Sequence, residues 1–353
     1  MINYTSPAVA DDLKILYQAS VNWELLKNKT ILVTGSTGML ASWFTFMLMY
    51  LNEHENFGMK LLLLARNRNK LKQVFGNESD YMNFLVQDVC DKITVQTEID
   101  YIFHAAGAAS PYSILNDPAG IALANTLGTI NVLELARKTN TQKVLFTSTR
   151  EVYGKVEGKD MTTENDMGII DPLDSRSCYP ESKRMAETLL KSYSIQHQIN
   201  FNTLRIAHVY GPGMQLENDG RIMADLLTDA LTQKNIHLKS DGTAVRAFCY
   251  ITDAVEAIFR VLTEGKNNEA FNIANESEPV TILELARLIQ SAAGNDNKVF
   301  VKNEKVPVPG YCNYKRVKLD TSKTESLGWR PKVLLSEGIY RTIKSLPKTK
   351  SYE

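Results

Sequence analysis

Short apolar segments recur along the chain as far as Gly211, and segments with a helical pattern lie between several of them. Within the apolar segments, apolar and polar residues do not alternate, which is typical of strands buried on both faces of a sheet. The apolar segments span residues 30–34, 60–65, 84–86, 101–104, 143–147 and 202–206, and the helical patterns span 38–53, 116–138 and 176–197. Strands and helices at this spacing predict right-handed β-α-β units. The predicted fold class is therefore α/β, with a doubly wound parallel sheet.

The regular alternation ends at the loop Gly211-Pro212-Gly213, after which the helical patterns are shorter and the strands isolated. We therefore predict three parts, with the chain free to cross back from the third to the second. They are an N-terminal extension (1–28), a sheet domain (29–210) and a smaller α/β cap formed mainly by 211–353. In the extension, residues 11–18 are expected to form a helix. Its large apolar side chains, Trp23, Leu25 and Leu26, are expected to pack on the sheet domain.

The charges of the chain are balanced, with 40 lysines and arginines against 40 aspartates and glutamates in 353 residues. This balance argues against a nucleic-acid partner and against a charged disordered tail. The four cysteines, Cys90, Cys178, Cys249 and Cys312, are too far apart in sequence for a metal or disulfide pattern, so no metal site is predicted. The first residues lack the apolar core of a secretion signal, and the apolar run 39–51 is too short to span a bilayer. These features favour a cytoplasmic protein without a membrane partner.

A glycine-containing turn joins the first predicted strand to its helix, with the sequence VTGSTGMLA over residues 33–41. Gly35 permits the tight turn, and Gly38 lets the backbone approach a pyrophosphate. The free N–H groups at the helix start then face the phosphates. Because this turn directly follows the first strand, it predicts a dinucleotide-binding domain of the Rossmann type. Its predicted cofactor contacts are Gly35, Thr37, Gly38, Met39 and Leu40.

The choice between NAD and NADP depends on the end of the second predicted strand. An acidic residue about 20 positions after the turn usually binds the ribose hydroxyls of NAD, but the second strand of this chain ends in Ala65-Arg66-Asn67-Arg68. An arginine there suits the 2′-phosphate of NADP, so Arg66 slightly favours NADP; the alternative is that both arginines are simply solvated. Four further predicted cofactor contacts follow the third and fourth strands: Asp88, Val89, Ala105 and Ala106. The first of them equally suits a helix cap.

The predicted reacting residues follow the fifth strand and lie on the long helix after it. Thr149 follows the strand 143–147, and active sites of doubly wound sheets lie at the carboxyl ends of strands. Tyr179 and Lys183 are four residues apart and so share one face of a helix. An ammonium group lowers the pKa of a neighbouring phenol, which would make Tyr179 a base near neutral pH, while Thr149 donates to the same substrate oxygen. The same spacing recurs at Tyr311/Lys315, Tyr314/Lys318 and Tyr340/Lys344, so position and not spacing singles out this pair.

Five motifs together resemble the extended short-chain dehydrogenases/reductases that act on nucleotide-sugars, within the NAD-dependent epimerase/dehydratase family. They are TGSTGML, HAAGAASP, TSTREVYG, YPESK and VYGPGM, and the resemblance runs from about Lys29 to Trp329. Within the family, the segments SRSCYPESKRMAET and AVRAFCYITDAVEAI are most similar to those of UDP-glucuronate decarboxylases. The resemblance implies a Rossmann domain, a C-terminal domain for a nucleotide-sugar substrate, a tightly held NAD or NADP and a homodimer.

The resemblance also implies roles for further residues. Glu151 and Arg246 fall where the decarboxylases carry a catalytic glutamate and arginine. Arg246 suits a substrate carboxylate but also a pyrophosphate, and Glu151 equally suits an anchoring role in its loop. The predicted substrate contacts are Ser110, Arg150, His208, Arg221 and Arg246. Besides Ala65-Arg66, which lacks the acid usual in NAD-using members, two residues depart from the family pattern: Arg150 stands where decarboxylases usually have serine and 4,6-dehydratases aspartate, and His208 replaces an asparagine.

These residues together predict a transient oxidation at C4 of a sugar. Tyr179 takes the proton of the C4 hydroxyl while hydride leaves C4, and the resulting 4-ketone accepts the electrons when a C6 carboxylate leaves as CO₂. A nucleotide-sugar 4-epimerase and an NADPH-dependent 4-keto-sugar reductase need the same residues and are the alternatives. Outside enzymes, the alternative is a non-catalytic dinucleotide sensor, which the complete set of Thr149, Tyr179 and Lys183 disfavours.

Overall fold

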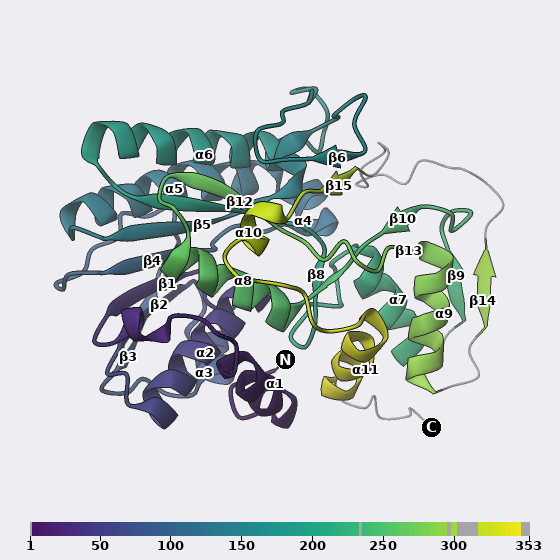
Figure 1. Ribbon diagram of the computed structural model, residues 1–353, viewed down its shortest axis with the longest axis horizontal. Helices are drawn as coiled ribbons and strands as arrows, with labels where there is room; N and C mark the ends of the chain where they lie inside the picture. The colour runs from purple at the N-terminus through teal and green to yellow at the C-terminus, as the bar shows by residue number, and fades with distance from the viewer. Residues whose placement is uncertain (1, 233–234, 295–297, 302–316, 347–353) are drawn as a thin grey trace.

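The computed structural model describes residues 2–232, 235–294, 298–301 and 317–346, and a seven-stranded sheet forms its centre (Figure 1). In spatial order the strands are β12 (Glu269–Ile273), β7 (Phe201–Ile206), β5 (Lys143–Thr149), β4 (Tyr101–His104), β1 (Thr30–Thr34), β2 (Lys60–Ala65) and β3 (Met82–Val86). Every pairing between neighbours is parallel. The strand order changes direction between β1 and β4, which is where open α/β sheets bind their ligands. The predicted doubly wound parallel sheet is confirmed.

Helices cover both faces of the sheet, and neighbouring residues of a strand enter different cores. Ile31 and Val33 of β1 lie in the core with α2 (Met39–Glu55) and α8 (Ile251–Glu264), whereas Leu32 lies in the core with α5 (Pro118–Lys138) and α6 (Cys178–His197). All three side chains are fully buried. Because both faces are covered, the strand is apolar at successive positions, as its sequence indicated.

The helical pattern predicted over 116–138 contains a break. The short helix α4 (Pro111–Asn116) ends before α5 begins at Pro118, and Asp117 between them caps α5, its side chain accepting the Gly120 N–H at 3.1 Å. Proline suits the first turn of a helix because its missing N–H would have no partner there. The prediction of a single helix starting at residue 116 is therefore wrong at its start.

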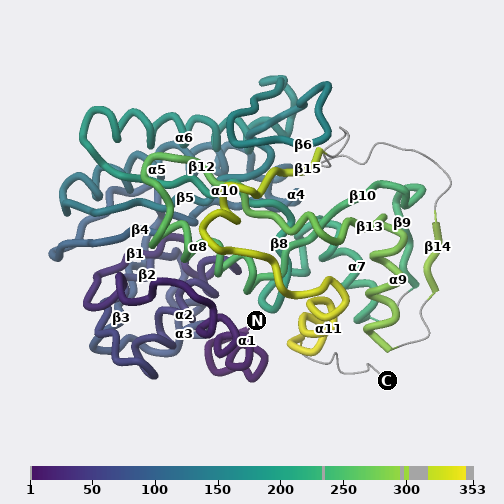
Figure 2. Tube along the Cα trace, viewed as in Figure 1, coloured from purple at the N-terminus to yellow at the C-terminus, as the bar shows by residue number. Residues whose placement is uncertain are grey.

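Helix α5 lies along α6 over one face of the sheet (Figure 2). Among the described residues, α5 is the one helix that is long and apolar enough to cross a membrane, judged by length and composition alone. Its inner side is buried in the core, while Leu123 and Leu127 of α5 and Met185 of α6 are exposed. The two helices therefore present apolar side chains on the outer surface of the molecule.

The N-terminal extension packs on the main body through α1 (Pro7–Tyr17) and the 3₁₀ turn η1 (Trp23–Leu26). Trp23 and Leu26 are buried as predicted, but Leu25 is 43% exposed, since a single 3₁₀ turn does not direct all of its side chains to the same side. The buried carboxylate of Asp12 accepts the Tyr250 hydroxyl at 2.7 Å and also pairs with Arg341. The extension is thus tied to the C-terminal part of the chain.

The C-terminal part holds a smaller group of elements beside the main sheet, built on α7 (Ile222–Leu231), α9 (Ile282–Ala293) and α11 (Leu335–Ser345) (Figure 1). Its chain crosses back, because α8 and β12 belong to the main sheet and its covering layer. The remaining elements are short: α3 (Arg68–Phe75), η2 (Arg150–Tyr153), β6 (Met161–Thr162), β8 (Val209–Tyr210), β9 (Ile236–Leu238), β10 (Val245–Arg246), β11 (Cys249–Tyr250), β13 (Val280–Thr281), β14 (Val299–Val301), β15 (Lys318–Leu319) and α10 (Ser322–Glu325).

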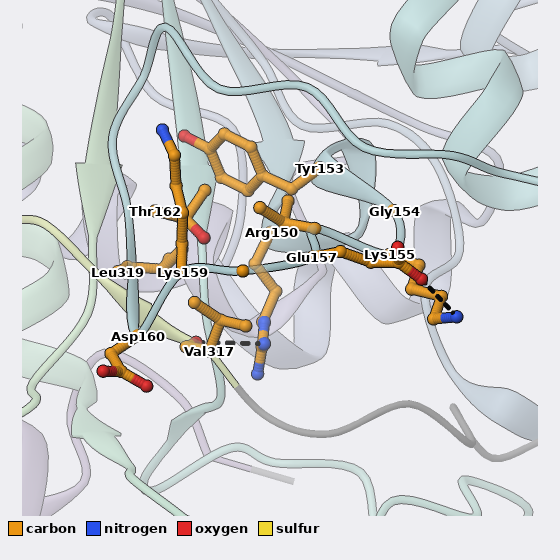
Figure 3. A pocket seen from close by; sticks show the side chains of 12 residues that line it. Arg150, Tyr153, Gly154, Lys155, Glu157, Lys159, Asp160, Thr162, Val317 and Leu319 are labelled. Carbon is orange, nitrogen blue, oxygen red and sulfur yellow. Dashed lines mark hydrogen bonds and ion pairs between the residues drawn. The ribbon is translucent and has the colours of Figure 1, made fainter.

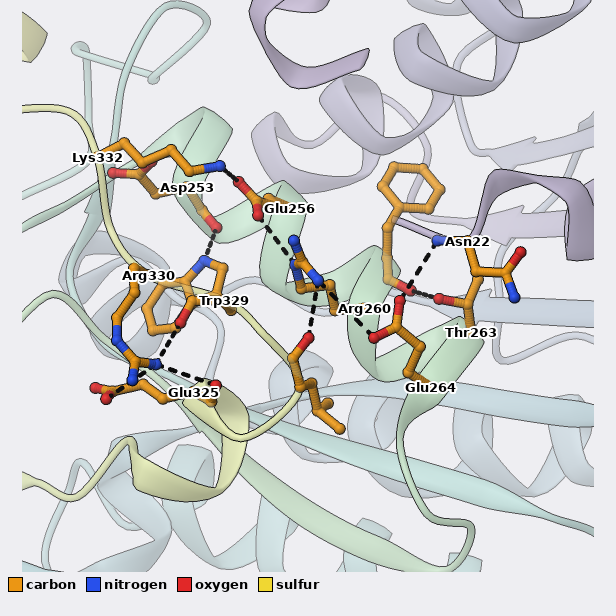
Figure 4. A network of polar contacts seen from close by, with 12 residues as sticks. Asn22, Asp253, Glu256, Arg260, Thr263, Glu264, Glu325, Trp329, Arg330 and Lys332 are labelled. Atoms are coloured by element: carbon orange, nitrogen blue, oxygen red, sulfur yellow. Dashed lines mark hydrogen bonds and ion pairs between the residues drawn. The ribbon is translucent and has the colours of Figure 1, made fainter. Parts of the chain in front are cut away.

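A buried polar network holds the final segment against α8 (Figure 4). Glu256 accepts the Arg260 Nε–H at 3.0 Å and the Lys332 ammonium at 2.6 Å. Nearby, the Trp329 indole N–H donates to the carbonyl of Asp253 at 2.8 Å, and the indole is fully buried. Pairing of this kind satisfies the charges that the interior would otherwise penalise.

Candidate functional site

The turn after β1 packs closely against the end of β4 and leads into a helix start without a side-chain cap. Gly35 has a φ of +62°, and a Cβ there would lie 2.7 Å from the carbonyl oxygen of Ala105. Gly38 precedes α2 without a side-chain cap, so the first N–H groups of the helix, from Met39 and Leu40 onward, have no partner within the helix. These features fit the pyrophosphate of a dinucleotide, which takes N–H donors at a helix start.

The predicted cofactor contacts after β2 and β3 differ in exposure. Arg66 is largely exposed, with its Nη1 3.7 Å from Oδ2 of Asp88. Asp88 accepts the Cys90 backbone N–H at 2.9 Å, which lowers the pKa of its carboxyl group. The side chain of Val89 is buried, where it would contact a Cβ at Gly128 of α5. Of these residues, Arg66 is the side chain with freedom to reach a bound ligand.

Ala105 and Ala106 are fixed by a chain of buried hydrogen bonds at the end of β4. Both backbone N–H groups donate to Thr34 Oγ1 at 3.2 Å, so the Thr34 hydroxyl donates in turn to Nδ1 of His104 at 2.8 Å. The other ring nitrogen of His104 lies 3.1 Å from Thr129 Oγ1, which donates to a carbonyl and therefore accepts. Burial lowers the pKa of His104 to about 3. This histidine is a neutral, fully bonded structural residue.

The proposed reacting residues come together at the carboxyl end of β5. Thr149 is the last residue of β5, and its hydroxyl is hydrogen-bonded to the phenol of Tyr179. Lys183 donates from Nζ to the carbonyl oxygen of Thr147 at 2.7 Å, and Tyr179 and Lys183 are both buried in the first turns of α6. Of the other Tyr-x-x-x-Lys pairs, Tyr311, Tyr314 and Lys315 lie outside the described residues.

The electrostatics of this pair differ from the expectation. Burial raises the pKa of Tyr179, and the Glu151 carboxylate raises it further. Burial also lowers the pKa of Lys183 to about 7. The prediction that Lys183 lowers the pKa of the phenol is therefore wrong for this structure, because desolvation dominates both groups and the ammonium is directed at the Thr147 carbonyl. In this state Tyr179 is a protonated phenol.

Glu151 is held beside Tyr179 by a residue that the sequence analysis did not assign to the site. Arg176 donates from Nη2 to both carboxylate oxygens of Glu151, at 2.8 and 2.6 Å, and both side chains are mostly buried. Both charges act on the phenol of Tyr179. A signal was available, since Arg176 lies three residues before Tyr179 in the segment SRSCYPESK that carried part of the resemblance.

Arg221 also reaches the site, and Ser110 lies at the start of α4, where its predicted substrate contact stays a prediction. Arg221 precedes α7, donates to both carboxylate oxygens of the buried Asp219 at 2.6 Å, and lowers the pKa of Tyr179 by its charge. Ser110 caps α4 by accepting the Ser113 N–H at 3.2 Å. Asp219 lies next to α4, since its carbonyl accepts the Tyr112 N–H at 3.0 Å.

Arg246 lies at the end of β10, a strand of the C-terminal part that pairs with β13. Its Nη1 donates to the carbonyl oxygen of Val245 at 2.8 Å. The charged groups with the largest effects on the phenol of Tyr179 are instead Glu151, Arg221 and Arg176. A role for Arg246 toward the substrate therefore stays a prediction from the resemblance.

The two residues that depart from the family pattern are in contact. Arg150 places Nη1 3.2 Å from Nε2 of His208, and its Nη2 donates to the carbonyl of Val317 at 3.5 Å. Arg150 lines a cavity of about 330 Å³ bounded by the loop after β5 and by the segment around β15. Figure 3 shows the guanidinium of Arg150 extended toward Val317 and away from the ring of Tyr153.

Comparison with known proteins agrees with this architecture. Residues 31–274 match the model of the NAD dependent epimerase/dehydratase family. The chain is 34% identical over 313 residues to UDP-glucuronic acid decarboxylase 6 of Arabidopsis thaliana, a match that covers 88% of this chain and 87% of that protein.

Two solved structures show the same overall arrangement. The UDP-glucose 4-epimerase of Thermotoga maritima, crystallised with UDP-glucose, is 27% identical with a TM-score of 0.74. The UDP-glucose 4-epimerase of Thermus thermophilus, in complex with NAD, is 25% identical with a TM-score of 0.74. Each match covers 90% of this chain and 98% of the other. Fold, glycine turn and family match agree, and the chain belongs to the NAD-dependent epimerase/dehydratase family.

Proposed function

We propose that this protein removes the C6 carboxylate of a UDP-glucuronate-like nucleotide-sugar, working through a transient 4-keto sugar. The observation that carries the proposal is the assembly of Thr149, Tyr179 and Lys183 at the end of β5, with Glu151 fixed beside the phenol by Arg176. The 34% identity to a plant UDP-glucuronic acid decarboxylase over most of both chains supports it.

Each residue of the site has its own role in the first step, the oxidation at C4. When bound, a nicotinamide cofactor would supply the acceptor and later the donor of a hydride, and the residues of the Gly35 turn would hold its pyrophosphate. The phenolate form of Tyr179 takes the proton of the sugar C4 hydroxyl and returns it at the end of the cycle. Thr149, already bonded to the phenol, orients the same oxygen, and Lys183 fixes the end of β5 beside it by donating to the Thr147 carbonyl.

The loss of CO₂ depends on a carboxylate held against a 4-ketone. When the C5–C6 bond breaks, its electron pair passes into the C4 carbonyl, and C5 then takes a proton. We assign Glu151 to orienting the sugar ring or to carrying that proton, because its pair with Arg176 fixes its carboxylate close to Tyr179. The carboxylate itself needs a cation, for which Arg246 or Arg150 is suited by the bidentate geometry of a guanidinium.

We assign the nucleotide to the C-terminal part. A cavity of about 510 Å³ lies there between α7 and β9, with Asn218 and His237 among its lining residues. These two side chains suit a nucleobase, whereas Lys239 is paired with Asp225 at 2.8 Å, so the assignment covers the base and not the phosphates. The cavity starts close to Arg221, whose charge reaches Tyr179, so it is positioned to direct the sugar toward the phenol.

Release of labelled CO₂ tests the reaction directly. The purified protein is incubated with UDP-glucuronate labelled at the carboxyl carbon, and we expect labelled CO₂ together with a UDP-pentose. A 4-epimerase, which the similarity to two solved UDP-glucose 4-epimerases also supports, would invert UDP-glucose without CO₂. A 4-keto-sugar reductase would consume NADPH in proportion to product. Either of those outcomes in the absence of CO₂ would contradict the proposal.

We further propose that the cofactor is NADP, on the basis of Arg66 at the end of β2. We expect Arg66→Ala to weaken NADP binding by roughly tenfold or more, because the guanidinium would lose a charge-assisted bond to the 2′-phosphate. NAD binding should change less than about twofold, as fluorescence titration would show. Arg68→Ala is the matched control, since Arg68 pairs with Glu78 at 2.7 Å. Equal losses for both cofactors in Arg66→Ala would reject NADP.

We also propose a homodimer through α5 and α6, whose outer surface exposes Leu123, Leu127 and Met185. An apolar surface of this kind is costly in water and is typical of a protein–protein contact. Neither a membrane nor a nucleic acid has a place in this proposal. The cytoplasmic location stays a prediction from the sequence.

A further inference from the structure

Arg150 directly follows Thr149 in the chain and is a cation without an acidic partner in the part of the chain that the structure describes. The two lysines that follow it in the same loop are ion-paired, Lys155 with Glu157 at 2.6 Å and Lys159 with Asp166. Arg150 instead contacts His208 and the carbonyl of Val317. A guanidinium has five N–H donors, so several are left for a ligand.

The backbone of His208 lies in the left-handed region. Its φ is +46°, a value that histidine and asparagine both adopt more readily than most residues, and asparagine is the residue usual there in the family. Because a guanidinium only donates, Nε2 of His208 accepts from Arg150 and the ring proton is on Nδ1.

The position of the pair relative to the reaction is set by the backbone. Arg150 directly follows Thr149, which is bonded to the phenol of Tyr179, and directly precedes Glu151. Arg150 is therefore the immediate neighbour in sequence of the groups proposed to act on C4 and C5 of the sugar, and His208 contacts it from the loop before β8.

We propose that Arg150 and His208 form a single specificity element that recognises an anionic substituent on C5 of the sugar, and thereby selects uronate substrates over neutral hexoses. This inference rests on the proposed function and names its carboxylate-binding residue. Arg150 contacts the carboxylate, and His208 acts as a positioning residue by fixing the direction of the guanidinium. A neutral hydroxymethyl group offers a weaker acceptor for the same donors. The two departures from the family pattern thus have one explanation.

The test is a binding experiment that needs no turnover. In the Tyr179→Phe background, titration calorimetry compares UDP-glucuronate with UDP-glucose. We expect a preference for UDP-glucuronate that Arg150→Ser reduces by roughly tenfold or more, with UDP-glucose binding changed less than about twofold. Arg150→Lys should restore part of the preference, and melting temperatures confirm that each variant folds. Lys155→Ser is the matched control, since it removes a cation from the same loop and should leave the preference unchanged.

The positioning role of His208 is tested by a double-mutant cycle. We expect His208→Asn to lower the preference by severalfold, and Arg150→Ser with His208→Asn to match Arg150→Ser alone, because the histidine acts only through the arginine. Additive losses would overturn the positioning role. A wild-type site without preference for UDP-glucuronate, or an Arg150→Ser variant that weakens both ligands equally, would overturn the whole inference.

The outcomes also separate this inference from the proposed function. If the wild-type protein releases CO₂ and Arg150→Ser still prefers UDP-glucuronate over UDP-glucose, the decarboxylase proposal stands. In that case Arg150 is not the residue that binds the carboxylate. If the preference for UDP-glucuronate depends on Arg150 but no CO₂ is released from it, the specificity element stands and the decarboxylation is rejected.

Discussion

Tyr179 differs from the other tyrosine of α6 in ways that bear on its proposed role. Tyr193 lies on the outer part of the helix and donates to Glu134 at 2.9 Å. Tyr179 is buried and bonded to Thr149, with the charges of Glu151 and Arg176 close by. Tyr193 thus makes a structural hydrogen bond, whereas Tyr179 lies among the groups proposed to react.

Tyr179→Phe should therefore lower kcat for CO₂ release by roughly 10²- to 10⁴-fold, the range usual for removing a general base. Dinucleotide binding and the melting temperature should stay near wild type, because the ring still fills its buried site. Tyr193→Phe is the control on the same helix and should keep its activity. Full turnover by Tyr179→Phe would remove the phenol from the mechanism.

The buried His104 makes the free energy of unfolding depend on pH. The pKa of His104 is about 3 in the folded protein and 6.5 ordinarily, so between these values the unfolded chain binds a proton that the folded chain excludes. The contribution of the neutral His104 to the free energy of unfolding is therefore fully present above about pH 6.5. Below that value it falls by about 1.4 kcal/mol per pH unit. Urea denaturation from pH 7 to 5 should show about 2 kcal/mol more loss in wild type than in His104→Gln. Parallel pH profiles for the two proteins would contradict the assignment.

At the scale of elements, the sequence predicted local structure better than long-range pairing. The first six strands of the sheet were predicted close to their observed bounds, because parallel strands covered on both faces have a uniformly apolar pattern. Strand β12 was not predicted as part of this sheet, since its residues 269–273 carry the same kind of local pattern as an isolated strand. Which neighbour a strand pairs with is not a local property.

In the candidate site, too, the places of residues along the chain could be predicted, whereas their contacts with distant residues could not. Thr149, Tyr179 and Lys183 were assigned from their places at a strand end and a helix start, and the structure brings them together. Arg176 was missed because its importance comes from a contact with Glu151, 25 residues earlier in the chain. The contact of Arg150 with His208 could not be predicted either, since it joins η2 to the loop before β8.

Helix α1 is expected to stabilise the whole protein through one buried carboxylate. Asp12→Ala would leave the buried Tyr250 hydroxyl and part of the Arg341 guanidinium without their acceptor. We expect a loss of about 2–4 kcal/mol in the free energy of unfolding, measured by urea denaturation. Asp11→Ala is the control, since Asp11 is its exposed neighbour on the same helix. If both variants lower the free energy of unfolding by the same small amount, α1 is held in place without the contacts of Asp12.

For the whole molecule, the exposed apolar side chains of α5 and α6 predict the state of assembly. Leu123→Glu with Met185→Glu should convert a dimer into a monomer, because two charges would be buried in each copy of a symmetric contact. Light scattering coupled to size-exclusion chromatography measures the mass. Ile15→Glu is the control, since Ile15 is exposed on α1, far from these helices (Figure 1). A wild-type protein that elutes as a monomer would contradict the dimer.

The return of β12 to the edge of the main sheet has a consequence for biosynthesis. The strand that covers β7 is made only after more than 60 further residues, so the nascent chain holds an open sheet edge while the ribosome completes the C-terminal part. A product cut short before residue 269 would keep that edge permanently exposed to other chains. Expression of the first 210 residues alone is therefore expected to yield inclusion bodies, rather than a free-standing nucleotide-binding unit.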